Sequence, residues 1–271
     1  MRAFILQLSL LLLPIFLHAQ VPSNTDPPAQ SRDSIISEHL KHGAWKHSYY
    51  SREWQEEIDK GIAKDSTIAY LWQQKAMPLF KQGKYELGMQ YIDKAVRYAP
   101  EDYLDYRAFI KCIFAKSYAA AIADFEACKR RFGYSYVQDH SYDFYIALSK
   151  IQLNQYEEAK QMLIQDLAAQ EARAGKDFVH FLDIFYLGIC HYELGEYARA
   201  EKVLGAAIEI YPQFSDAQYY RSLCLLRMGD KEVAQALYKE AKENGLAGYT
   251  INESNAIYER YPYQVRWHNK R

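Results

Sequence analysis

Three histidines near the N-terminus, His39, His42 and His47, are the residues whose spacing first suggests a chemical role. His39 and His42 lie one helical turn apart, so a helix could direct both imidazoles toward one metal ion. A protein metal site needs further ligands, and no carboxylate or cysteine completes a convincing set beside them. We therefore expect these histidines on solvated helix faces and predict no metal site.

Other reactive side chains are scattered along the chain. His140 and Asp143 could form an acid–base pair, but helical surfaces bring such neighbours together constantly. His180 and His191 fall in different helical segments and are expected in the core or at its rim. The sequence contains no phosphate-binding loop, dinucleotide-binding glycine pattern, nucleophile elbow or zinc-protease motif. We predict no catalytic residue and no cofactor; an enzyme or carbohydrate-handling protein that uses the histidine-bearing N-terminal unit is the weaker alternative.

The four cysteines, Cys112, Cys128, Cys190 and Cys224, show no C-x-x-C spacing, which argues against zinc binding and redox chemistry. All four fall in apolar stripes of predicted helices, where cysteine behaves as a small hydrophobic residue. We expect buried free thiols. The alternative is a bridge between Cys112 and Cys128, which would require their Cα atoms to lie within about 7 Å.

The composition indicates a folded protein that does not bind nucleic acid. Hydrophobic residues make up 49% of the 271 positions, which is typical of globular proteins. The 33 lysines and arginines nearly balance the 34 aspartates and glutamates, so the basic surface expected of a nucleic-acid-binding protein is missing. The 25 tyrosines favour helix packing and recognition surfaces, because tyrosine combines a wide apolar ring with a polar tip.

The N-terminus has the pattern of an export signal. Residues 1–19 combine a positive start, an apolar run and a small residue at the end, which predicts a signal peptide cleaved after Ala19. The alternative is an uncleaved membrane anchor, but the apolar run is shorter than the roughly 20 residues that cross a bilayer and is interrupted by Pro14. Residues 20–33 are rich in proline and polar groups, so we expect a flexible linker there and no transmembrane segment after cleavage.

Beyond the linker the sequence repeats itself. Four segments share a tyrosine, a small residue three positions later and a large apolar residue four positions after that. A fifth segment, 229–242, has Lys231 in place of the tyrosine, and these key positions follow one another at intervals of 33, 38, 41 and 34 residues. The two longer intervals contain extended connections at 132–139 and 172–177, which are candidates for functional projections. The four complete sets are Tyr85, Gly88 and Ile92; Tyr118, Ala121 and Phe125; Tyr156, Ala159 and Leu163; Tyr197, Ala200 and Leu204.

These residues resemble the tetratricopeptide repeat family, whose period is 34 residues. The resemblance covers residues 34–243, with about five repeats and a degenerate N-terminal one, and the export signal suggests an exported bacterial member. It implies an all-α fold, a right-handed α-solenoid of stacked antiparallel helix pairs. Small residues in each pair allow the two helix axes to approach to about 8–10 Å.

In this family the first helix of each repeat lines the concave wall of the superhelix. The resemblance implies an apolar and aromatic groove here, so a clamp of lysine and asparagine for a ligand carboxylate is not expected. The alternative is that the stripe is core, because a register error of one residue would turn this wall inward. The residues carried onto the wall are Tyr70, Gln73, Met77, Tyr103, Tyr106, Ile110, Phe144, Leu148, Leu182, Phe185, Ile189, Tyr219, Leu223 and Arg227.

Residues 244–271 match no repeat but carry several large apolar side chains, among them Ile251, Tyr261 and Trp267. A disordered tail would hold few such groups. We expect this aromatic segment to cap the last repeat, with entry into the groove as a further option.

Together these features predict a non-enzymatic protein–protein interaction scaffold of the bacterial periplasm or envelope. Its partner would be an unidentified protein or peptide bound in the concave groove, and no nucleic acid. The alternative is a permanent structural subunit of an envelope or secretion assembly, with the groove always occupied.

Overall fold

The computed structural model describes residues 30–175 and 178–268 of the chain. The chain divides into residues Met1–Ser31 and a compact unit, Arg32–Arg271, and the description below concerns the second. The predicted signal peptide, residues 1–19, lies outside the described residues, as does all of the predicted linker before residue 30.

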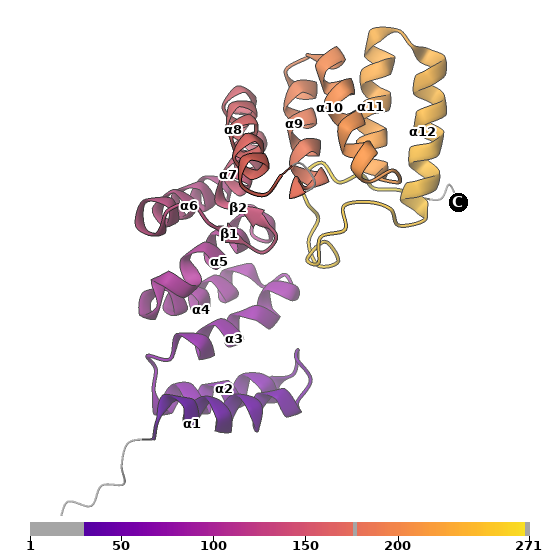
Figure 1. The fold of residues 1–271 in the computed structure, drawn as a ribbon. Coiled ribbons are helices and arrows are strands. Elements are labelled where there is room, and N and C mark those ends of the chain that lie inside the picture. The colour runs from indigo at the N-terminus through magenta and orange to yellow at the C-terminus, as the bar shows by residue number, and fades with distance from the viewer. Residues whose placement is uncertain (1–29, 176–177, 269–271) are drawn as a thin grey trace, which may run out of the picture. The chain divides into compact units, whose positions relative to one another are not determined.

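The compact unit is built almost wholly of helices (Figure 1). Short helical turns accompany α1, and a hairpin of two short antiparallel strands, β1 (Tyr136–Val137) and β2 (His140–Ser141), occupies the first long connection. The helices are α1 (Arg32–Ile36), α2 (Arg52–Lys64), α3 (Ala69–Lys81), α4 (Tyr85–Tyr98), α5 (Pro100–Ile113), α6 (Tyr118–Phe132), α7 (Tyr142–Gln152), α8 (Tyr156–Ala174), α9 (Phe181–Glu193), α10 (Tyr197–Ile210), α11 (Ser215–Met228) and α12 (Lys231–Leu246).

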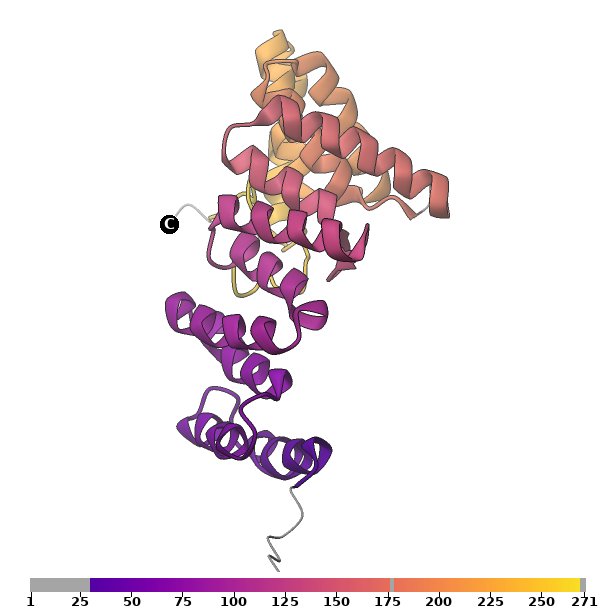
Figure 2. The ribbon, with the colours of Figure 1, turned by 90° about the vertical axis from the view of Figure 1, so that its left-hand side faces the viewer.

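Successive helices pack as hairpins that stack on one another. The pairs are α3 with α4, α5 with α6, α7 with α8, α9 with α10 and α11 with α12, and the second helix of each pair packs on the first helix of the next. The first helices α5, α7, α9 and α11 also contact one another in sequence, so they form a common face. Figure 2 shows the same stack from a second direction. The predicted all-α solenoid of stacked helix pairs is confirmed.

The small residues of the repeat pattern lie where helices approach most closely. Ala121, Ala159 and Ala200 are completely buried at their helix contacts. At Gly188 in α9, an added Cβ would lie 2.7 Å from the side chain of Leu204 in α10, which is too close for any carbon contact. The small residues of the repeat pattern therefore mark the positions where paired helices lie closest together.

Replacing Gly188 by alanine should consequently destabilise the protein by about 1–3 kcal/mol, because Leu204 must leave its packed position. Gly205 provides a matched control within α10, since its added Cβ would meet only the Arg221 side chain at an ordinary 3.5 Å. Gly205→Ala should stabilise the helix by about 0.5–1 kcal/mol through the higher helix propensity of alanine. Urea denaturation of both variants checks the opposite signs; a stabilised Gly188→Ala would contradict the packing.

One continuous apolar core runs from α3 to the segment that follows α12, and it includes Ile251 and Tyr261. A smaller core gathers under α1 and α2 around Leu40, Trp54 and Ile58. The four cysteines are buried free thiols, so their predicted burial is confirmed. Among the described residues, no helix combines the length and apolar character required to cross a bilayer.

Candidate functional site

The C-terminal segment, residues 249–268, contains no helix or strand and runs back along the first helices of the preceding repeats. In Figure 1 it is the yellow chain that leaves α12 and passes beside α11 and α9. The face it covers is called here the first-helix face: the surface that α7, α9 and α11 present to this segment.

Asp216 at the start of α11 fastens two parts of the C-terminal segment at once. Its Oδ2 accepts hydrogen bonds from the Thr250 hydroxyl at 2.5 Å and from the Ile251 backbone N–H at 3.0 Å. Its Oδ1 accepts from the Val265 N–H at 2.6 Å. Burial raises the pKa of the Asp216 carboxyl, and these hydrogen bonds act in the opposite direction. The Asp216 carboxylate thus binds the segment both where it leaves the surface of α11 and where it returns to it.

Trp267 closes the segment onto the last repeat. Its indole N–H donates to the Ser215 hydroxyl at 3.2 Å, and its ring packs edge-on against Tyr219 at 5.8 Å between centroids. The same ring lies directly over Gly245 in α12, where any side chain would overlap it. The expected packing of this segment on the last repeat is therefore present in the structure.

The segment continues past the last repeat onto α9. The Tyr186 hydroxyl donates to the Pro262 carbonyl at 2.8 Å, and the Tyr263 hydroxyl donates to Glu193 at 2.8 Å. The ring of Tyr263 also packs against Tyr220 of α11, with centroids 5.7 Å apart. These contacts combine aromatic packing with one hydrogen bond to the backbone of the segment and one from its Tyr263 side chain.

Two lysines extend these contacts toward earlier repeats. Lys116, in the turn between α5 and α6, donates to the Arg260 carbonyl at 2.5 Å. The ammonium group of Lys81, at the end of α3, lies 4.7 Å from the centre of the Tyr258 ring. The C-terminal segment therefore reaches residues of four different repeats.

The structure separates the predicted groove residues into two groups. One group is buried in the core, where no partner can touch its side chains. The prediction that these residues line an accessible wall is therefore wrong. The other group is partly or well exposed, and in it the Tyr106 hydroxyl contacts the Met77 sulfur. The buried residues are Ile110, Phe144, Leu148, Leu182, Phe185 and Ile189. The accessible ones are Tyr70, Gln73, Met77, Tyr103, Tyr106, Tyr219, Leu223 and Arg227.

The difference between the predicted and the observed wall residues has a simple geometric cause. One residue along a helix rotates the side-chain direction by about 100°. Phe185 points into the core, whereas the next residue, Tyr186, reaches the C-terminal segment. Tyr219 and Tyr220 of α11 both contact the segment, through Trp267 and Tyr263 respectively.

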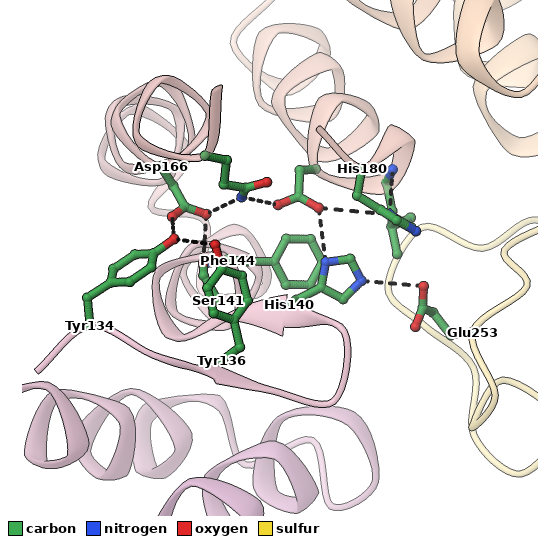
Figure 3. A network of polar contacts seen from close by, with 11 residues as sticks. Tyr134, Tyr136, His140, Ser141, Phe144, Asp166, His180 and Glu253 are labelled. Carbon is green, nitrogen blue, oxygen red and sulfur yellow. Dashed lines mark hydrogen bonds and ion pairs between the residues drawn. The ribbon is translucent and has the colours of Figure 1, made fainter. Parts of the chain in front are cut away.

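A buried polar network lies beside this face, where the β-hairpin, α8, α9 and the C-terminal segment meet (Figure 3). The imidazole of His140 lies between two carboxylates, with Nδ1 2.9 Å from Asp183 and Nε2 3.3 Å from Glu253. Burial alone would lower the pKa of His140, but the two carboxylates outweigh it and raise the pKa to about 9. The two carboxylates therefore favour the protonated imidazole, which joins the hairpin and α9 to the C-terminal segment.

Further polar groups hold the carboxylates of this network. The Gln170 amide donates to Asp183 Oδ1 at 3.0 Å and to Asp166 at 2.9 Å. Asp166 also accepts from the hydroxyls of Ser141 at 2.6 Å and Tyr134 at 2.8 Å. Ser141 in turn caps the N-terminus of α7, so the network fixes the hairpin to both neighbouring repeats.

Within the described residues, one group of side chains could hold a metal ion: His140, His180 and Asp183, whose nearest donor atoms lie within 4.8 Å of one another. The sequence offered no signal for it, because His140 and Asp183 are 43 residues apart. Asp143, which local spacing had paired with His140, instead forms an ion pair with Lys129.

One of the three N-terminal histidines does not lie on a solvated helix face as predicted. His42 and His47 are exposed, as predicted, but His39 is buried between Glu38 and Glu57, with nitrogen–oxygen distances of 3.5 and 3.7 Å. The packing of α2 on the preceding turns encloses it.

Comparison with known proteins agrees with the repeat pattern. The tetratricopeptide repeat family matches residues 69–102, 182–214 and 216–244. No curated protein matches the chain.

Several solved structures share the fold. A tetratricopeptide repeat protein from Parabacteroides merdae is 18% identical, with a TM-score of 0.60 over 81% of this chain and 88% of that one. PilW, a widely conserved type IV pilus biogenesis factor, is 13% identical, with a TM-score of 0.60 over 80% and 93%. YrrB, a tetratricopeptide repeat protein with an unusual peptide-binding site, is 18% identical, with a TM-score of 0.50 over 70% and 93%. The three matched segments and the stacked helix pairs together show that this chain contains tetratricopeptide repeats.

Proposed function

We propose that this protein is a non-enzymatic scaffold that binds an extended polypeptide on its first-helix face. The observation that carries the proposal is the C-terminal segment itself, which already lies on this face as a chain without helix or strand, with turns at 254–258 and 262–263. Tyr186 and Lys116 donate to its backbone carbonyls, and Asp216 accepts from its backbone N–H groups. Contacts to backbone atoms suit any extended chain, while pockets for side chains provide selectivity.

The relatives support the proposal at the level of the fold. YrrB is described as having an unusual peptide-binding site, and PilW as a pilus biogenesis factor. Transferred to this chain, such a role would use Tyr219, Tyr220 and Leu223 of α11 on the first-helix face. The other accessible groove candidates, among them Tyr70, Gln73, Met77 and Tyr106, lie on α3 and α5 and would extend the contact toward the N-terminal repeats.

The proposal includes a location in the periplasm or envelope of a bacterium. Its support is the apolar N-terminal pattern that ends at Ala19. Chemical sequencing of the N-terminus of the native protein tests this part alone, since an exported and processed chain should begin at Gln20.

A peptide-exchange experiment tests the binding face. In the full-length chain, Ile251→Ser combined with Tyr261→Ser should loosen the resident segment and lower the stability of the repeats that share its core, so circular dichroism first verifies that the variant is helical at the assay temperature. A labelled peptide of residues 249–267 should then bind this variant at least about tenfold more tightly than wild type. The reason is that the wild-type segment competes at an intramolecular concentration on the order of millimolar. Fluorescence anisotropy measures the binding.

Two controls define the outcome. A peptide that itself carries the two serine substitutions should not bind, and adding Asp216→Ala to the loosened protein should weaken binding about tenfold. If the unmodified peptide fails to bind the loosened and still helical variant, the first-helix face does not accept a polypeptide in trans and the proposed function is wrong.

A further inference from the structure

No metal site was expected from the sequence, yet the polar network has the composition of one. We propose that His140, His180 and Asp183 form a binding site for a divalent transition-metal ion of the zinc type, with Glu253 as the outer partner of His140. Imidazole nitrogen and carboxylate oxygen are suitable zinc ligands, and three protein ligands with one open position form a common zinc arrangement. The metal ligands lie outside the C-terminal segment, and Glu253 links the site to the segment that occupies the proposed binding face.

The orientation of Asp183 is the first argument. Its Oδ1 is held by the Gln170 amide at 3.0 Å, which leaves Oδ2 directed toward both imidazoles. Oδ2 lies 2.9 Å from Nδ1 of His140 and 4.0 Å from Nδ1 of His180. One carboxylate oxygen thus faces two nitrogen ligands, while the other is fixed by an amide.

The second argument is the environment of His140. Its second ring nitrogen faces Glu253 at 3.3 Å. Histidines that bind metals almost always donate their other N–H to a carboxylate, carbonyl or water, which fixes the ring and increases its basicity as a ligand. Here Glu253 of the C-terminal segment is that outer partner, and the ion would replace the proton between His140 Nδ1 and Asp183. Metal binding would therefore favour the docked segment.

The third argument is space. A cavity of 190 Å³ adjoins the three residues and is lined also by Tyr136, Gln170 and Arg173. It can hold a water molecule or a partner's side chain as a fourth ligand. Arg173, the cation at its rim, stacks on the Tyr134 ring at 3.8 Å. The side chain of His180 is 34% exposed, and its Nδ1 accepts the Leu182 backbone N–H at 3.2 Å as the N-cap of α9. Binding of an ion by this nitrogen would replace that hydrogen bond.

Zinc titration of the full-length, chelator-treated protein tests the proposal. Isothermal titration calorimetry and metal analysis after dialysis should show one zinc ion per chain. His180→Ala removes a ligand that is about one-third exposed and should weaken binding about 100-fold, and Glu253→Gln should weaken it about tenfold. His42→Ala, an exposed histidine outside the network, is the matched control and should bind zinc like wild type.

Cobalt provides an independent readout of the ligands. The cobalt-loaded protein should show the visible absorption of a four-coordinate site without a thiolate charge-transfer band, since no cysteine takes part. Circular dichroism verifies that each variant is folded, and Asp183→Asn, which keeps the shape of the side chain, replaces His180→Ala if the latter is unfolded. Substoichiometric zinc in wild type, or undiminished binding in the folded ligand variants, would overturn the proposal.

Discussion

Ile251→Ala is expected to lower the free energy of unfolding by about 2–5 kcal/mol, although residue 251 lies outside every helix. The Ile251 side chain is 2% exposed and belongs to the same core as the helices of the repeats. Its removal leaves a cavity between the C-terminal segment and α11, where Asp216 accepts the backbone N–H of the same residue. In a domain of this size the loss should appear as a fall in melting temperature of about 5 °C or more.

Ile257→Ala is the matched control for this prediction. It removes the same atoms from the same segment, but Ile257 is 81% exposed and its loss should change stability by less than about 0.5 kcal/mol. Thermal and urea denaturation followed by circular dichroism compare the two variants. Equal effects of the two substitutions would mean that the segment does not rest on α11 in solution.

The helix pairs could be predicted because their cause is local. A tyrosine and a small residue three positions later recur in each repeat, and the small residue is needed wherever two helices touch. Ala121, Ala159 and Ala200 occupy these contacts as the pattern predicts. This pattern can be recognised within each repeat without knowledge of the remaining chain.

The register of the first-helix face could not be predicted in the same way. An exposed face appears in a sequence as a polar stripe, but α9 has buried residues on every side, including Asp183, Phe185, Tyr186 and His191. The C-terminal segment covers the side of α9 that would otherwise be exposed to solvent. The apolar period of the helix is therefore blurred, and Phe185 and Tyr186 are indistinguishable as candidates for the wall.

The polar network was beyond sequence reasoning for a different reason. Its members come from the hairpin, α8, α9 and the C-terminal segment, and His140 and Glu253 are 113 residues apart. No helical period relates them, so only the stacking of the repeats brings them together. The local spacing of histidines instead suggested His39 and His42 as a pair, and neither residue belongs to the network.

Phe185→Ala separates the two interpretations of the predicted groove. The phenyl ring is completely buried and packs against Phe214 at 5.1 Å and Tyr220 at 6.0 Å between centroids. Truncation should therefore cost about 3–5 kcal/mol of stability, the usual loss for a phenylalanine in a core. Urea denaturation measures the loss.

Phe178→Ala is the control for a surface ring, because Phe178 is 73% exposed and its loss should be nearly neutral. A wall residue would behave like Phe178 in stability and lose only peptide binding, whereas a core residue loses stability first. A Phe185→Ala protein as stable as wild type would restore the original assignment of this ring to the groove. The expected large destabilisation instead makes the partly exposed Tyr220, which contacts Tyr263 of the C-terminal segment, the position at which binding can be altered while the repeat stack stays intact.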